Sequence, residues 1–139
     1  MRIVLISPSG SVARALAQLQ TSHDEIIVVS RSAPDAEITS IPIAPRWHRA
    51  TQRLEKLLGG SALGRNLQRL SPLDAGLRFA AAARRNDALR ACIQRTDLIV
   101  VLERDGILTG WRAAKNWAPA HARAVYGVAP AQAFVTDSA

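Results

Sequence analysis

The chain has 139 residues, 48% of them hydrophobic, and a formal net charge of +7. This length fits a single domain with a buried core, and the hydrophobic fraction argues against disorder. No apolar run reaches the roughly 18 residues that cross a bilayer, so we expect a cytoplasmic protein. The single cysteine, Cys92, excludes an internal disulfide and is expected in the core. Three scattered histidines predict no metal site.

The N-terminal segment has the pattern of a strand–helix–strand unit. Arg2–Ile6 and Ile26–Val29 are short apolar runs, typical of strands that are buried on both faces of a parallel sheet. Between them lie a Ser-Pro-Ser-Gly-Ser turn and a helical pattern over Val12–Leu19. Ser9 or Ser11 is expected to be the N-cap of this helix.

The same turn partly matches the glycine fingerprint of dinucleotide-binding proteins. The three fingerprint positions are Ser7, Gly10 and Ala13, so only the middle glycine is present. Arg31, after the second apolar run, can accept a 2′-phosphate or stand as an exposed loop residue. NAD(P) binding is therefore one alternative for this chain.

Residues 46–95 form a basic segment without strand signals. They hold eleven of the eighteen Lys and Arg residues and three of the eleven acidic residues. Leucine stripes at Leu54–Leu58 and Leu63–Leu70 predict helices, and Asp74 and Asn86 are predicted to cap two more. Such a charge excess attracts phosphate, a lipid headgroup or nucleic acid, although a solvated helical face explains it too. Nucleic acid is disfavoured, because six aromatic residues offer few stacking partners.

A charged turn follows the next apolar run. Leu98–Leu102 predicts another buried strand, after which the charged residues are Glu103, Arg104 and Asp105. Beyond them, apolar residues recur at helical spacing, at Ile107, Leu108, Trp111 and Ala114. Ligands of open α/β sheets bind beyond the carboxyl ends of the strands, so this turn is a candidate site. Asp105 has a second interpretation as the N-cap of the following helix.

Three phrases of the sequence resemble a known protein family. They are Met-Arg-Ile-Val-Leu-Ile-Ser-Pro-Ser-Gly at the N-terminus, Leu-Ser-Pro-Leu-Asp-Ala-Gly-Leu-Arg-Phe from residue 70, and Thr-Asp-Leu-Ile-Val-Val-Leu-Glu-Arg-Asp-Gly-Ile-Leu-Thr-Gly-Trp-Arg-Ala-Ala-Lys from residue 96. Together they resemble the N-terminal half of actinobacterial glycosyltransferases of the GT-B fold, in the family-4-like group. Those enzymes consist of two Rossmann-like domains.

The resemblance implies an acceptor-binding domain with its site at the strand ends. The loop of Ser9, Gly10 and Ser11 would lie near the donor phosphates, at the start of a helix. Glu103 or Asp105 would act as the general base on an acceptor hydroxyl.

Two arginines complete the candidate site. Arg104, in the charged turn, and Arg31, after the second strand, are the candidates for binding anionic groups of the substrate. No metal ligand is predicted among them.

The family binds its nucleotide-sugar donor in a second Rossmann-like domain with a paired-glutamate motif, and these 139 residues contain neither. We therefore expect no activity from this chain alone and no cofactor beyond a donor that a second domain supplies. The expected partners are a donor-domain subunit or a second copy of the chain. An anionic membrane surface is the alternative partner, which would place the protein at the inner face of the membrane.

The sequence thus predicts an α/β fold, a Rossmann-like three-layer domain over residues 1–139 with a short, mainly parallel sheet. The basic segment 46–95 is expected as an Arg-rich helical insertion. Arg2–Ile6, Ile26–Val29 and Leu98–Leu102 are expected to be adjacent, parallel and buried. Minor elements are a strand near residues 39–43, another within 124–128 and a helix near 131–135.

Overall fold

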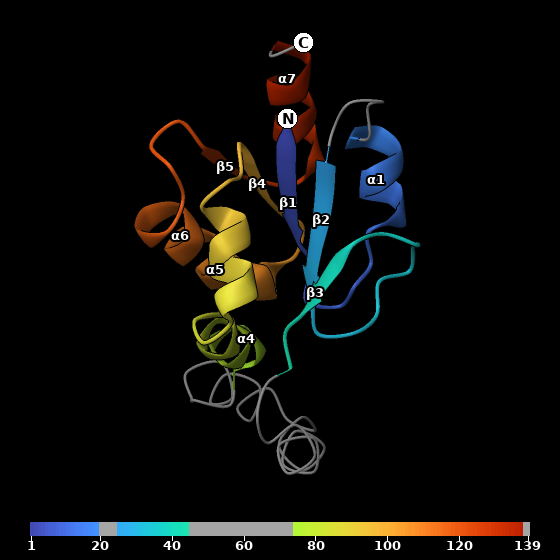
Figure 1. Ribbon diagram of the computed structural model, residues 1–139. Coiled ribbons are helices and arrows are strands. Elements are labelled where there is room, and N and C mark those ends of the chain that lie inside the picture. The colour runs from blue at the N-terminus through green and yellow to red at the C-terminus, as the bar shows by residue number, and fades with distance from the viewer. Residues whose placement is uncertain (20–24, 45–73, 138–139) are drawn as a thin grey trace, which may run out of the picture.

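The protein is an α/β domain built on one parallel sheet (Figure 1). The computed structural model describes residues 1–19, 25–44 and 74–137. Within these ranges there are five strands and five α-helices. The leucine stripes at Leu54–Leu58 and Leu63–Leu70 lie outside the described residues.

The five strands lie in the order β3-β2-β1-β4-β5, and every pair of neighbours is parallel. Their bounds are β1 Arg2–Ile6, β2 Glu25–Ser30, β3 Ser40–Pro42, β4 Leu98–Val101 and β5 Arg123–Tyr126. The central strand β1 lies between β2 and β4, which confirms that the three main apolar runs are adjacent and parallel. This order is that of the first five strands of a Rossmann sheet.

The apolar runs are continuous because both faces of the sheet are covered. Along β1, Ile3 and Leu5 point to one face, while Val4 and Ile6 point to the other. All four residues of β4 are buried as well. A strand that is buried on both faces has no position left for a polar side chain.

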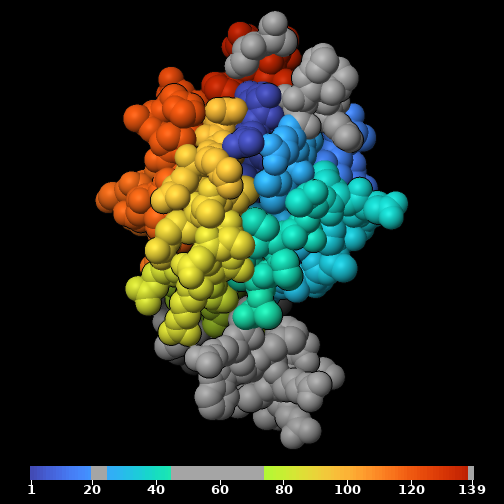
Figure 2. All heavy atoms as spheres, in the orientation of Figure 1, coloured from blue at the N-terminus to red at the C-terminus, as the bar shows by residue number. Residues whose placement is uncertain are grey.

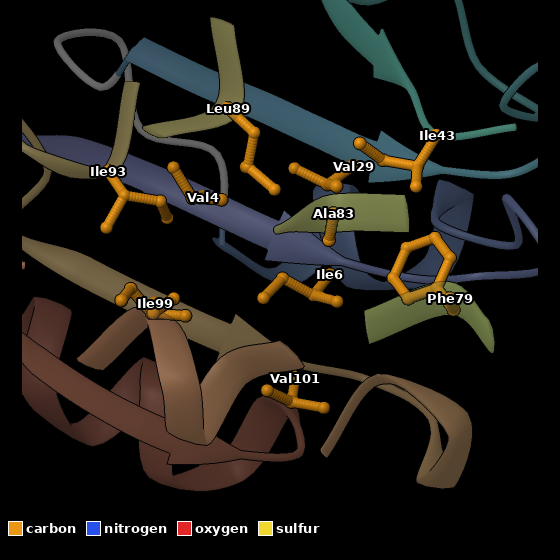
Figure 3. Packing of buried hydrophobic residues seen from close by; sticks show 11 residues of the cluster. Val4, Ile6, Val29, Ile43, Phe79, Ala83, Leu89, Ile93, Ile99 and Val101 are labelled. Atoms are coloured by element: carbon orange, nitrogen blue, oxygen red, sulfur yellow. The ribbon is translucent and has the colours of Figure 1, made fainter. Parts of the chain in front are cut away.

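Two layers of helices enclose the sheet. The helices are α1 Ala13–Leu19, α4 Ala75–Ala83, α5 Asp87–Ile93, α6 Ile107–Asn116 and α7 Val128–Asp137. Residues of α1 and α7 share one core cluster with one face of the sheet, and residues of α4, α5 and α6 share a second cluster with the other face. Figure 3 shows this second cluster, in which Phe79 and Leu89 from the helices meet Val29 and Ile6 from the strands.

Two of the predicted helix caps are confirmed. Asp74 accepts hydrogen bonds from the backbone amides of Gly76 and Leu77 at the start of α4. Asn86 accepts one from the amide of Leu89 at the start of α5. Each such cap satisfies amides that have no partner inside the helix.

The two other cap predictions are wrong. At the start of α1 the carboxylate of Asp35, from the loop after β2, accepts the bonds that were expected at Ser9 or Ser11. Asp105 does not cap α6, because it lies inside a 3₁₀ turn, Arg104–Gly106, that precedes the helix. The first miss has a tertiary cause, because Asp35 comes from another loop, whereas the second comes from an extra local turn before α6.

Helix α6 packs on the sheet through its small residues. Its buried residues are Thr109, Gly110 and Ala113, while Ile107 and Trp111 are 46% and 55% exposed. A methyl group on Gly110 would overlap Cγ2 of Val101 on β4, so glycine allows the helix to approach the sheet closely. The large apolar residues whose spacing predicted the helix therefore face outward.

The described part of the basic segment forms α4 and α5, and residues of this part contribute to the face of the molecule seen in Figure 2. Arg84, Arg85 and Arg95, in the turns that follow α4 and α5, are exposed. Within the described ranges, no helix has the length and hydropathy required to cross a membrane.

Candidate functional site

The loop after β1 and the turn after β4 meet at the carboxyl edge of the sheet. The two strands are neighbours, with Ile6 opposite Val101 in register, so the segments that follow them leave the sheet side by side. The loop after β1 is tightly wound, because the amide of Gly10 donates to the carbonyl of Ser7 at 2.9 Å. Gly10 has φ of +87°, and a Cβ there would lie 2.9 Å from the carbonyl oxygen of Ala33.

Glu103 joins the two segments through its carboxylate. The hydroxyls of Ser7 and Ser9 both donate to Oε1, and the amide of Ser9 donates to Oε2 at 3.1 Å. The Ser7 side chain is fully buried, whereas Ser9 lies at the surface. Hydrogen bonds to a charged acceptor are about twice as strong as neutral ones, so this contact fixes the loop against the turn.

A second carboxylate occupies the start of α1. Oδ1 of Asp35 accepts from the amides of Val12 and Ala13 at 2.9 and 3.0 Å. In dinucleotide-binding proteins the pyrophosphate lies at the start of the corresponding helix. A pyrophosphate would therefore have to displace a carboxylate of the chain itself.

Asp105 faces Arg31 across the same edge. Their closest atoms, Oδ2 and a guanidinium nitrogen, are 3.9 Å apart, and the side chains are 38% and 24% exposed. The Nε atom of Arg31 donates to the carbonyl of Pro8 at 3.3 Å, which holds the side chain over the loop. A pair at this distance and exposure contributes little to stability, so Asp105 remains accessible to another partner.

A cavity of about 480 Å³ opens beside Asp105, between the beginnings of α4 and α6. Its lining combines charged and exposed apolar side chains: Asp74, Gly76, Leu77, Arg104, Asp105, Ile107, Leu108 and Trp111. Lys115 lies over the indole of Trp111, with its amino group 4.9 Å from the ring centre. A concave site with apolar walls and a few polar groups is the usual form of a small-molecule site.

A smaller cavity of about 330 Å³ lies at the opposite edge of the sheet, beside α5. It contains Cys92 and the exposed ion pair of Arg2 with Glu25, whose atoms are 2.8 Å apart. Cys92 is only half-buried, so the prediction that it lies in the core is confirmed only in part. Burial nevertheless raises the pKa of its thiol, which keeps it protonated at neutral pH and makes it a poor nucleophile.

The structure thus divides the predicted site residues into two groups. Ser9 contacts Glu103, and Ser9 Oγ also accepts from the amide of Ser11 at 3.2 Å. Asp105 and Arg104 instead line the larger cavity, while Arg31 contacts Asp105 without lining that cavity.

Sequence reasoning missed several contributors to these two places. The sequence marks Ser7 only as a fingerprint position, whereas its buried hydroxyl is a main donor to Glu103. Asp35 was missed because it acts across a tertiary contact, and the exposed wall of Leu77 and Trp111 was missed because it depends on the orientation of each helix. The clue in the sequence for Trp111 was Gly110 beside it.

The sequence matches no family model and no curated protein, and the fold matches no solved structure. The described residues include no group of three His, Cys, Asp or Glu side chains that can hold a metal ion.

Proposed function

We propose that this chain supplies the acceptor side of a glycosyl-transfer site, with the acceptor bound in the cavity between α4 and α6. The observation that carries this proposal is the lining of that cavity, where a carboxylate, a guanidinium and an exposed indole stand together. These belong to Asp105, Arg104 and Trp111. The resemblance of the sequence to the acceptor-side half of GT-B glycosyltransferases supports the same assignment.

Each of the three side chains has a role that suits a hydroxylated acceptor. Asp105 accepts the proton of the acceptor hydroxyl as general base, because its carboxylate lines the cavity and is partly exposed. Arg104 donates hydrogen bonds to acceptor oxygens from the same turn. Trp111 offers an apolar ring surface to the C–H face of a sugar or polyol, beside the polar groups.

Glu103 is a weaker candidate for the base. Its carboxylate already accepts hydrogen bonds from three donor groups of Ser7 and Ser9, so it is less available to a substrate hydroxyl. We assign the base to Asp105 and a structural contact to Glu103.

The donor, a nucleotide-sugar, would be held by a second domain outside these 139 residues. Half a cleft neither orients both reactants nor excludes water. We therefore expect the purified chain to release no nucleoside diphosphate from any nucleotide-sugar and to bind such donors no more tightly than ~1 mM. Turnover by the isolated chain that is lost in Asp105→Ala would show that the donor site lies within this domain.

The acceptor side is tested by binding. The isotope-labelled chain is titrated with methyl α-glucoside, methyl α-mannoside and glycerol, and the indole and backbone signals of Trp111 and its neighbours are followed by NMR. We expect saturable shifts around Trp111 with at least one probe, and binding at least tenfold weaker in Asp105→Asn.

The matched control is Asp87→Asn, which removes an exposed carboxylate outside the cavity. It should bind like the unmodified chain. Probes that shift no signal near Trp111, or an Asp105→Asn variant that binds equally well, would contradict the proposal.

A second candidate function is binding to an anionic membrane surface, favoured by the exposed Arg84, Arg85 and Arg95 in the turns after α4 and α5. Sedimentation with vesicles should then show binding to anionic but not to neutral lipid, weakened by salt. Equal binding to both kinds of vesicle, or to neither, would contradict it.

A further inference from the structure

The loop after β1 holds an anion that belongs to the chain itself. Two hydroxyls and one amide, from Ser7 and Ser9, converge on the carboxylate of Glu103. These donors form a cradle that is separate from the first amides of α1, which the carboxylate of Asp35 occupies. We call the three donors the serine cradle.

We propose that Glu103 is an internal latch on the serine cradle, and that an external oxyanion binds there only when the Glu103 side chain leaves. Hydroxyl and amide donors do not distinguish a side-chain carboxylate from a free carboxylate or phosphate, since each presents oxygen acceptors with negative charge. Glu103 competes well with a free anion for these donors, because a group tethered to the chain is present at a high effective concentration.

Burial makes the cradle a defined site. Ser7 has no exposed surface, so its hydroxyl must have an acceptor within the protein or a ligand. With Glu103 withdrawn, that hydroxyl keeps only its weaker contact with the carbonyl of Ser11, at 3.3 Å. An incoming anion would restore the lost hydrogen bonds.

The latch also links the loop to the turn that carries Asp105. Glu103 immediately precedes the 3₁₀ turn Arg104–Gly106, and its side chain bonds this turn to the loop after β1. Release of Glu103 would therefore change the position of Asp105 relative to Arg31, whose Nε is bonded to Pro8 in that loop. An anion bound in the cradle would favour the position that the turn takes once Glu103 has left.

The test is thermal stability with and without added anions. Wild type and Glu103→Ala are unfolded in sodium chloride, sodium acetate or sodium phosphate at equal ionic strength. We expect phosphate or acetate to raise the midpoint of Glu103→Ala by about 3 °C relative to chloride, and to leave wild type within about 1 °C. The acetate and phosphate arms show which kind of oxyanion the cradle accepts.

Two further variants locate the effect. Ser9→Ala in the Glu103→Ala background removes one donor of the cradle and should abolish most of the gain, while Asp87→Ala, an exposed carboxylate elsewhere, should show no gain at all. If Glu103→Ala is too unstable to assay, Glu103→Gln replaces it. This side chain keeps its volume and loses its charge, and its phosphate affinity from NMR titration should exceed that of wild type at least tenfold.

Three results would overturn the latch. These are equal anion effects in wild type and the Glu103 variants, no anion effect in either, and a gain that survives Ser9→Ala. All the measurements are made without an acceptor or a sugar donor, so their outcome is independent of the proposed glycosyl transfer.

Discussion

Helices α1 and α6 follow neighbouring strands of the same sheet, yet they use their apolar residues in opposite ways. Helix α1 buries its large side chains, Leu16 and Leu19, against the sheet. Helix α6 buries the small Gly110 and Ala113 and leaves Ile107 and Trp111 exposed. The large apolar side chains of α1 therefore build the core on one face of the sheet, while those of α6 form the wall of a cavity.

This difference separates stability from binding. On α1, removing a large buried side chain should create a void in the core. On α6, adding a methyl group at Gly110 should cause a clash with the sheet, whereas removing an exposed apolar side chain should affect only the cavity. The substitutions that follow test this contrast, from the largest expected effect to the smallest.

Val100→Asp should abolish folding. Val100 has no exposed surface and lies on the α1 side of β4, where an unpaired charge costs several kcal/mol. Circular dichroism should show no cooperative unfolding transition. The control is Ala124→Asp on the edge strand β5, which is exposed and should fold normally. A cooperative melt of Val100→Asp near the wild-type midpoint would show that this face is not a dry core.

Leu16→Ala should lower the free energy of unfolding by about 3 kcal/mol, through lost burial and the cavity that is left. Leu16 is 6% exposed and packs in the cluster that α1 shares with α7 and the sheet. Denaturant titration measures the change, with Ala17→Gly as a control at an exposed position of the same helix. Ala17→Gly should lower the free energy of unfolding by ~1 kcal/mol through helix propensity alone. If Leu16→Ala lowers it by no more than this, the contrast between the two helices does not hold.

Gly110→Ala should lower the free energy of unfolding by about 2 kcal/mol. The new methyl group would overlap Val101, and forced overpacking outweighs the ~1 kcal/mol that alanine gains in helix propensity. Ala114→Leu adds more atoms to an exposed position of the same helix and should be tolerated. If Gly110→Ala is instead more stable than wild type, the close approach of α6 to the sheet is not required.

Thr109→Val should raise the free energy of unfolding by about 1 kcal/mol. The Thr109 hydroxyl is buried under α6 and has no hydrogen-bond partner among the described residues, a state that costs stability. Valine has nearly the same shape and no polar atom. A lower melting temperature in Thr109→Val would mean that the hydroxyl is satisfied in solution.

Trp111→Ala should change the free energy of unfolding by only about 0.5 kcal/mol, as for most surface substitutions. It should nevertheless abolish the NMR shifts that sugar and polyol probes produce in the cavity, because the indole is part of the lining. The comparison with Leu16→Ala is direct, since both replace a large apolar residue of a helix. A loss of stability as large as that of Leu16→Ala would place Trp111 in the core.

The sequence by itself determined the sheet and most of its connections. Continuous apolar runs at Arg2–Ile6 and Leu98–Leu102 are typical of strands that are covered on both sides, so they indicated the parallel core. The caps at Asp74 and Asn86 were also predictable, because a cap bonds to amides two or three residues away along the chain. Hydrogen bonds between residues that are close along the chain can therefore be predicted from the local sequence.

The tertiary structure decided which side of α6 faces the sheet and which carboxylate meets which loop. The apolar spacing at Ile107 and Trp111 predicted a helix, but the packed face was set by Gly110, whose missing side chain lets β4 come close. Asp35 reaches α1 across more than twenty residues, and Glu103 reaches Ser7 across more than ninety. Periodicity and capping rules describe neighbours along the chain, and these contacts exist only because β2, β1 and β4 lie side by side.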